Sequence, residues 1–334
     1  MNRRLLMLMT ALLSIALAAT AGQAQQAPAA KTAAKTYVPP KTPWGDPDLQ
    51  GIWPSTDMIG VPLQRAANFG TRNVLTEEEF TQREAQAQRT AEADSEEFAK
   101  PGATVGINPP SHWIDRGKPN RQASLVVDPP DGRIPPVTPE AQQRVAQRAA
   151  ERRTRGAADS WEDRSLYERC ISRGVLGLLP VIYNNGTQII QGPGYLAFNY
   201  EMIHESRVIP LDKRPHAGSS IRTYMGDSRG HWEGNTLVIE TTNFLPERTA
   251  AGGTPTSDQF RLIERLTRVA DDTLQYEATI HDEKTWTLPW TISLPLTKDN
   301  SGYPIFEYAC HEGNYALEGI LSGARAEEAA AIKK

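Results

Sequence analysis

The sequence has few cysteines and lacks spaced metal-ligand motifs. Two cysteines among 334 residues are too few for a disulfide-rich scaffold, a multi-cysteine zinc module or a cysteine-ligated iron–sulfur cluster. No Cys-x-x-Cys, His-x-x-x-His, Walker loop or dinucleotide glycine fingerprint occurs. Any chemistry must therefore come from carboxylates, imidazoles and arginines.

Excess positive charge and long apolar runs are also missing. The formal net charge is -4, and without Arg3 and Arg4 it is -6, from 34 basic and 40 acidic residues. That balance argues against a nucleic-acid partner. After the first two dozen residues no apolar run is long enough to cross a bilayer, so we predict no integral membrane span in the mature protein.

Residues 1–24 have the pattern of a secretory signal peptide. Arg3 and Arg4 form the charged region, an apolar stretch follows from Leu5 to Ala19, and Gly22–Ala24 offers a small-x-small cleavage site. A membrane anchor is the alternative, but the apolar run is short. We predict cleavage and a periplasmic or secreted protein, in which a disulfide between Cys170 and Cys310 is chemically possible. The sequence alone does not give its geometry.

Four further regions follow the leader. Residues 25–42 are rich in Ala, Gln, Lys and Pro and are expected to be a disordered tether. Residues 43–174 are helical and loop-rich, with one polar helix opened by Thr76 and another opened by Thr138. Residues 175–322 are strand-rich, and 323–334 form a C-terminal tail.

Strand-like runs succeed one another from residue 187 onward. Turn-forming residues separate several of them, and short links favour antiparallel neighbours. We predict a mainly β fold: an eight-stranded antiparallel meander that closes into a lipocalin-like barrel, with the N-terminal region packed on it. A twisted open sheet and a two-sheet sandwich are the alternatives. The runs are 187–191, 195–204, 207–210, 232–244, 260–269, 273–282, 290–297 and 305–310.

Most histidines lie in this strand-rich half, and the segment 216–233 is its densest polar stretch. Its glycines allow close backbone approach to a ligand, and its arginines could hold a carboxylate or phosphate. The alternative is a connector whose charged groups satisfy one another. The candidate catalytic residues are His204, His231, His311 and Asp227, and the candidate substrate-binding residues are Arg222, Arg229, Tyr224, Trp232 and Glu201.

Acidic residues also occur within the predicted strands. Glu201, Glu240, Glu264 and Glu277 are each either outward solvent residues or inward acids. Glu277 shares a face with His281, and the usual hydrophobic-in alternation favours the outward orientation for both. No metal site is assigned, although ligands brought together by tertiary structure could hold a divalent metal.

Four segments resemble a large family of exported bacterial proteins, most of them uncharacterised. These segments are PWGDPDLQGIW (43–53), EMIHESRVIP (201–210), residues 225–244 with MGDSRGHWEGNTLVIETTNF, and EYACHEGNY (307–315). The resemblance covers nearly all of the mature chain. It implies an exported location and assigns no catalytic residues.

These patterns lead to two hypotheses about function. The first is an exported small-molecule-binding β-barrel protein that acts as a hydrolase or lyase through His/Glu acid–base chemistry at the barrel mouth. The second is a non-catalytic periplasmic binding or envelope-associated protein that uses the same cavity. An enzyme would gather His204, Arg222, Asp227, His231 and His311 in one water-accessible cleft.

Overall fold

The computed structural model describes residues 37–97, 113–174 and 176–332. The segment assigned to a signal peptide, and most of the tether, lie outside these residues. The described residues from Val38 onward belong to one compact unit.

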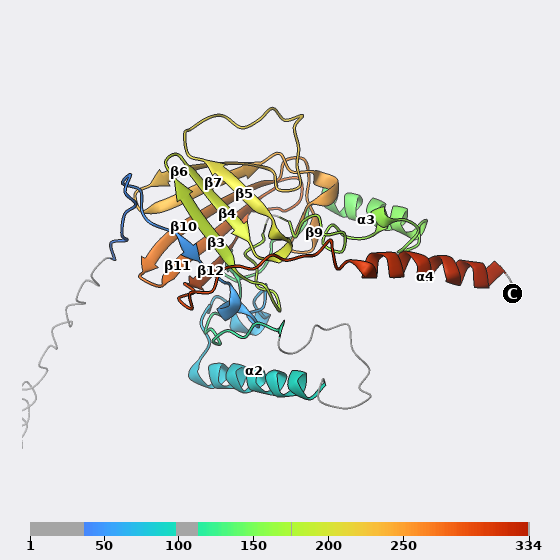
Figure 1. Ribbon diagram of the computed structural model, residues 1–334, viewed down its shortest axis with the longest axis horizontal. Helices are drawn as coiled ribbons and strands as arrows, with labels where there is room; N and C mark the ends of the chain where they lie inside the picture. The colour runs from blue at the N-terminus through green and yellow to red at the C-terminus, as the bar shows by residue number, and fades with distance from the viewer. Residues whose placement is uncertain (1–36, 98–112, 175, 333–334) are drawn as a thin grey trace, which may run out of the picture. The chain divides into compact units, whose positions relative to one another are not determined.

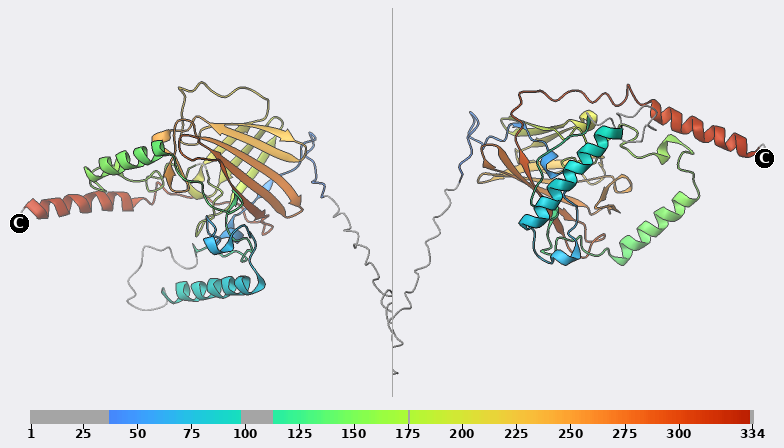
Figure 2. Two further views of the ribbon diagram at one scale, coloured as in Figure 1. Left: turned by 180° about the vertical axis from the view of Figure 1, so that it is seen from behind. Right: turned by 90° about the horizontal axis from the view of Figure 1, so that it is seen from below.

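Antiparallel strands form two main sheets (Figures 1 and 2). The smaller sheet has four strands in the order β1-β3-β4-β5, and the larger has six in the order β2-β12-β11-β10-β7-β6. The strands are β1 (Gly51–Ile52), β2 (Val126–Asp128), β3 (Thr187–Gly192), β4 (Tyr195–Tyr200), β5 (Ser206–Pro210), β6 (Asp227–Glu233), β7 (Thr236–Thr242), β10 (Arg261–Ala270), β11 (Thr273–His281) and β12 (Trp290–Thr297), with β8 (Ala250–Ala251) and β9 (Thr254–Pro255) in a small separate ribbon.

One apolar core lies between the two sheets. Leu196, Phe198 and Ile209 of the smaller sheet belong to the same buried cluster as Leu266 and Ile280 of the larger sheet. The alternation of β10 buries Glu264, which is therefore an inward acid, and Arg207 of β5 pairs with it across the core. Because side chains of both sheets fill this layer, the fold is a two-sheet arrangement, one of the alternatives to a barrel.

Glu277 and His281 take the opposite orientation. They alternate on β11 with Leu274, Tyr276, Ala278 and Ile280, all of which are buried, while Glu277 and His281 remain partly exposed. The outward orientation favoured by the usual alternation is confirmed.

The mainly β, antiparallel prediction is confirmed, but the described strands form no closed barrel. β5 and β6 are consecutive in sequence and lie in different sheets. The expected run 232–244 is not one strand: it contains the end of β6, a hairpin turn at Gly234, where φ is +61°, and then β7. The expected strand 305–310 is irregular.

The two predicted polar helices are confirmed as α2 (Glu77–Glu97) and α3 (Pro139–Arg153). In α2, the Thr76 backbone N–H donates to Glu79, and Glu79 N–H donates to the Thr76 hydroxyl. In α3, the Thr138 hydroxyl accepts from the Ala141 N–H. Both are N-caps that satisfy free backbone donors. Short 3-10 turns are η1 (Thr56–Met58), η2 (Ala67–Phe69), η4 (Trp161–Asp163), η5 (Met202–His204) and η6 (Pro246–Arg248).

After β12 the chain forms an irregular segment, 299–314, here called the strap, and then helix α4 (Tyr315–Ile332). The helix crosses the expected boundary at residue 322, so the described part of the predicted tail, residues 323–332, is helical. None of the strap residues and none of the α4 residues is buried. Within the described residues, no helix combines the length and apolarity that a membrane crossing requires.

Candidate functional site at one end of the sheets

The turn between β4 and β5 contains two consecutive non-glycine residues with positive φ angles. Ile203 has φ +62° and His204 has φ +47°. Ile203 is a β-branched residue, buried to 2% exposure, for which this region is sterically unfavourable. Cys170, nearby on the facing loop, has φ +57°. Such backbone strain persists where the surroundings enforce it, and it is concentrated at functional sites.

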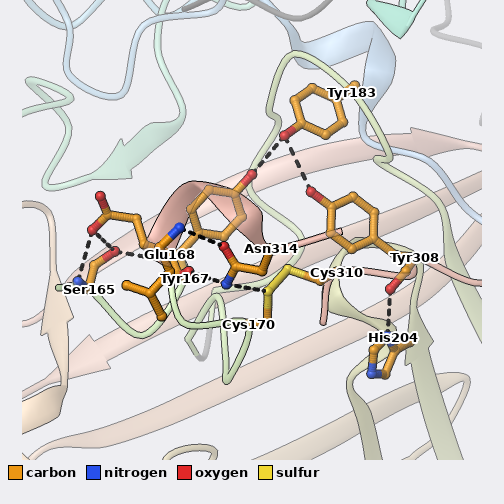
Figure 3. Close-up of a disulfide and its surroundings, with 10 residues drawn as sticks. Ser165, Tyr167, Glu168, Cys170, Tyr183, His204, Tyr308, Cys310 and Asn314 are labelled. Atoms are coloured by element: carbon orange, nitrogen blue, oxygen red, sulfur yellow. Dashed lines mark hydrogen bonds between the residues drawn. A yellow bond between two sulfur atoms is a disulfide. The ribbon is translucent and has the colours of Figure 1, made fainter. Parts of the chain in front are cut away.

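Cys170 and Cys310 form a disulfide that joins the loop before β3 to the strap (Figure 3). Asn314 follows closely: its side-chain amide donates to the Glu168 carbonyl at 2.9 Å and contacts Cys170 Sγ at 3.4 Å. The strap is thereby fixed to the body next to the one disulfide found among the described residues.

Three tyrosines lie beside the disulfide. The Tyr183 hydroxyl is 2.8 Å from that of Tyr167 and 3.4 Å from that of Tyr308, as Figure 3 shows. Burial raises the pKa of all three phenols, and the Arg173 guanidinium, which lies over the Tyr167 ring, opposes the increase. The phenols therefore stay protonated and form a neutral cluster of hydrogen-bond donors and acceptors.

Two of the predicted catalytic histidines meet at the strap. The His204 and His311 ring centroids are 6.0 Å apart, and His204 Nδ1 donates to the Tyr308 carbonyl at 2.8 Å (Figure 3). Since a carbonyl only accepts, Nδ1 carries the proton and Nε2 remains available. Both side chains are exposed.

A cavity of about 400 Å³, the strap cavity, lies between the strap and the smaller sheet. Three carboxylates and one guanidinium line it, so the lining is acidic. Glu201, a predicted binding residue, is among the carboxylates. The lining residues are Ile52, Pro54, Thr56, Asp115, Arg116, Gly186, Glu201, Asp299, Tyr303, Pro304, Ile305 and Phe306.

Each of these carboxylates uses only one oxygen within the described protein. Asp115 Oδ2 accepts from Asn185 at 2.8 Å, Glu201 Oε2 accepts from the Gly186 N–H at 2.9 Å, and Asp299 Oδ1 accepts from the Ser301 N–H at 2.8 Å. The other oxygens, Asp115 Oδ1, Glu201 Oε1 and Asp299 Oδ2, receive no donor from the residues that the structure describes. These bonds orient the carboxylates and leave acceptors available.

A second cavity, the arginine cavity, has a volume of about 1070 Å³ and lies beyond Tyr167, between α3, the 155–174 loop and the 247–255 segment. It contains Tyr224, another predicted binding residue, and its charges are mixed. Arg155 pairs with Asp163 and Arg164 with Glu168. The remaining charged residues of the lining are four arginines and three glutamates: Arg148, Arg152, Arg173, Arg248, Glu151, Glu162 and Glu247. Burial, and then the neighbouring Arg144 and Arg152, lower the pKa of Arg148.

Ser172 also lines the arginine cavity. Its hydroxyl donates to Glu205 at 2.9 Å. Burial raises the pKa of Glu205, although this hydrogen bond and one from the Arg173 backbone oppose the shift. Neither Ser172 nor Glu205 was singled out in the sequence, because the pattern shows no signal for a partly buried acid at the start of a strand.

Asp227 lies in a different group, on β6. It accepts from His216 Nδ1 at 2.9 Å, from the Ala217 N–H at 2.9 Å and from Arg229 Nη1 at 2.6 Å. Although burial opposes the shift, these bonds hold the pKa of Asp227 below its usual range. His216 Nε2 is 3.8 Å from Glu240. The sequence places His216 only at the edge of the polar segment, and the pairing with Asp227 needs tertiary structure.

The other predicted residues have separate surroundings. His231 Nε2 is 3.3 Å from Glu233 on the exposed end of β6, and Arg222 donates to the Phe244 carbonyl at 3.1 Å. Trp232 packs partly against the core. The structure thus brings His204 and His311 together, but no contact among the described residues links them to Asp227, Arg222 or His231.

Residues 226–230 also have the spacing Gly-x-Ser-x-Gly, which sequence reasoning missed. A nucleophile elbow places this serine on a strand-to-helix turn. Here Ser228 lies within β6, is buried, and its hydroxyl is 3.0 Å from that of Thr241. It has the surroundings of a structural residue.

Across the described ranges, no group of three or more His, Cys, Asp or Glu side chains has the arrangement of a metal site. Comparisons with protein-family models, curated proteins and solved structures found no match to the chain.

Proposed function

We propose that the protein binds a small organic cation in the strap cavity. The observation that carries the proposal is the set of three carboxylates around one cavity, each with an oxygen that lacks a donor from the described residues. Charge-assisted hydrogen bonds from an ammonium group to such oxygens are stronger than neutral ones.

The strap supplies the aromatic side chains of this cavity, and Ile52 and Pro54 of the body add further apolar lining. Tyr303 and Phe306 are 71% and 66% exposed. Aromatic faces near a carboxylate-lined cavity suit a ligand that has a cationic head and a hydrocarbon body, through cation–π attraction and burial. We place the ligand here rather than between the sheets because apolar side chains of both sheets fill the core.

Thermal-shift and calorimetric titration of the full chain with n-butylammonium tests this proposal, with 1-butanol as the neutral analogue. We expect the cation alone to raise the melting temperature by mass action. Asp299→Asn and Glu201→Gln should each weaken binding about tenfold, the cost of losing one bond between charged groups. Glu277→Gln, on the outer face of β11, is the matched control. Equal responses to amine and alcohol would overturn the proposal.

Acid–base catalysis is a second candidate, supported by the His216–Asp227 hydrogen bond. A carboxylate on Nδ1 fixes the imidazole tautomer and leaves Nε2 to accept a proton, the arrangement that activates water or a hydroxyl. The probe is hydrolysis of 4-nitrophenyl acetate over a pH series. His216→Gln should abolish the protein-dependent rate and its imidazole pH dependence, and His281→Gln should retain both. A rate unaffected by His216→Gln removes this candidate.

Export to the periplasm or the exterior remains a prediction from residues 1–24. Mass measurement of protein recovered from the producing cell tests it, since cleavage after Ala24 removes a defined N-terminal segment.

A further inference from the structure

The strap depends on Cys310 for its attachment. None of residues 299–314 is buried, so apolar burial contributes little to holding them. Beyond Asn300, the hydrogen bonds that join the strap to the body among the described residues are those of Tyr308 with Tyr183 and His204, and those of Asn314 with Glu168 and Cys170 Sγ. Segments with few buried contacts open at low free-energy cost once a covalent link is removed.

The two sulfurs of the disulfide differ in access. Cys170 is 3% exposed and lies on the body, whereas Cys310 lies on the strap and is only half-buried. A thiolate opens a disulfide by attacking one sulfur directly, so access selects the sulfur attacked. The approach favours Cys310 Sγ, with Cys170 as the leaving thiolate.

Asn314 is placed to assist that departure. Its Nδ2 group is 3.4 Å from Cys170 Sγ, and the Glu168 carbonyl holds the same amide at 2.9 Å (Figure 3). An N–H group directed at the sulfur stabilises the thiolate more than the disulfide, and a better leaving thiolate departs faster.

We propose that Cys310 is a thiol–disulfide exchange site for a dithiol, and that opening it releases one wall of the strap cavity. The dithiol's thiolate forms a bond to Cys310 Sγ as the Cys170–Cys310 bond breaks, and Cys170 leaves as a thiolate that takes up a proton. The second thiol then displaces Cys310, which is protonated in turn. Two electrons pass to the protein, and the dithiol becomes a cyclic disulfide.

Release of the strap alters the cavity itself. Asp299, Tyr303 and Phe306 belong to the strap, whereas Asp115 and Glu201 belong to the body. Opening therefore removes both aromatic walls, whereas Asp299, whose N–H donates to the Ile52 carbonyl at 2.8 Å, stays in place with the other carboxylates. The part of the inference that concerns ligand control rests on the proposed cation binding; the exchange site does not.

The sulfur assignment is tested with a brief exposure to glutathione, a monothiol whose first exchange step leaves a mixed disulfide. The full chain is treated, its free thiols are blocked with N-ethylmaleimide at mildly acidic pH, where exchange is slow, and the products are mapped by mass spectrometry. We expect glutathione on Cys310 and the alkyl group on Cys170. The reverse pattern would overturn the assignment.

Asn314→Ala tests the leaving-group role. Opening by glutathione should slow about fivefold, the value of one hydrogen bond, whereas Asn300→Ala, on the same strap, should leave the rate unchanged. An unchanged or faster rate in Asn314→Ala would show that the amide does not assist the leaving sulfur.

Strap release and ligand binding are measured by two separate assays. After reduction with dithiothreitol and alkylation, chymotrypsin should cut after Phe306 at least about tenfold faster, because proteolysis follows local opening. The n-butylammonium shift should also be lost. If the oxidised protein does not bind the amine, the proposed function fails, while the glutathione map and cleavage rate still decide the exchange site. Equal cleavage before and after reduction would overturn strap release.

Discussion

The two-sheet body and the strap with α4 are held by different means. The body buries large side chains such as Trp53, Trp286 and Trp290 to 2% exposure or less. The strap and α4 bury none and rely on one disulfide and a few polar contacts. The strap cavity therefore has one wall in a cooperatively folded unit and another that can leave without unfolding it.

The largest effect should come from the ion pair in the core. Arg207 of β5 is opposite Phe198 of β4 and pairs with Glu264, which also accepts a hydrogen bond from the Tyr276 hydroxyl at 3.0 Å. Arg207→Ala leaves a buried carboxylate without its cation, so we expect a loss of about 3–5 kcal/mol in urea unfolding.

Arg265→Ala is the matched control for this prediction. Arg265 neighbours Glu264 on β10, but its partly exposed side chain pairs with Glu233 on the outer face. Arg265→Ala should lower the free energy of unfolding by less than about 1 kcal/mol. Equal losses in the two variants would contradict the inward placement of the pair. A combined Arg207→Met and Glu264→Met protein should regain stability, since no isolated charge remains.

Overpacking between β5 and β6 should have the next largest effect. A Cβ atom at Gly230 would lie 2.6 Å from Leu211 Cδ2 and 3.0 Å from Ile209 Cγ2. Gly230→Val should destabilise the body by about 1–3 kcal/mol, because side chains there must shift. Gly192→Ala, where a Cβ meets nothing within 4 Å, should be nearly neutral in the same thermal unfolding assay. A tolerated Gly230→Val would show that the two strands separate easily.

The sequence predicts the body better than the site. Alternation on β10 and β11 is a local pattern, so it identifies both strands, and Pro139 with Thr138 identifies the start of α3. The division into two sheets depends on which strands pair with one another. Pairing between strands that are distant in sequence produces no periodic pattern of hydrophobic residues, so the sequence alone does not predict it. The hairpin turn at Gly234 has a local signal, the dipeptide Gly234-Asn235, which the expected single run 232–244 left out of account.

The site depends even more on tertiary structure. Glu201 is visible as an acid near a strand, but its companions Asp115 and Asp299 come from distant segments. His216 and Asp227 are eleven residues apart and meet only because the loop folds back onto β6. No spacing rule connects such residues, whereas metal and nucleophile motifs have fixed local spacing.

The raised pKa of Glu205 predicts a small pH dependence of the free energy of unfolding. Burial raises its pKa in the folded protein, so folding favours the protonated carboxyl. The stabilisation that comes from the protonated Glu205 carboxyl is fully present below the unfolded-state pKa of about 4.3. It is lost as the pH rises through the higher pKa of the folded state. Glu205→Gln should abolish that loss, so the stability difference between variant and wild type should grow with pH across this window. Urea unfolding at several pH values measures it, and a difference that shrinks with rising pH would contradict burial as the dominant cause.

Removing α4 should have the smallest effect. The helix buries no residue, and it touches the body mainly through Arg325, whose guanidinium donates to the Asp159 and Ala158 carbonyls at 3.0 and 3.1 Å. Truncation after Asn314 keeps the disulfide and should change stability by no more than about 0.5 kcal/mol, as for other exposed changes. Urea unfolding of the oxidised protein measures the change, and a much larger loss would mean that α4 is part of the cooperative unit. A negligible change would show that the disulfide and Asn314, rather than the helix beyond them, hold the removable wall of the cavity.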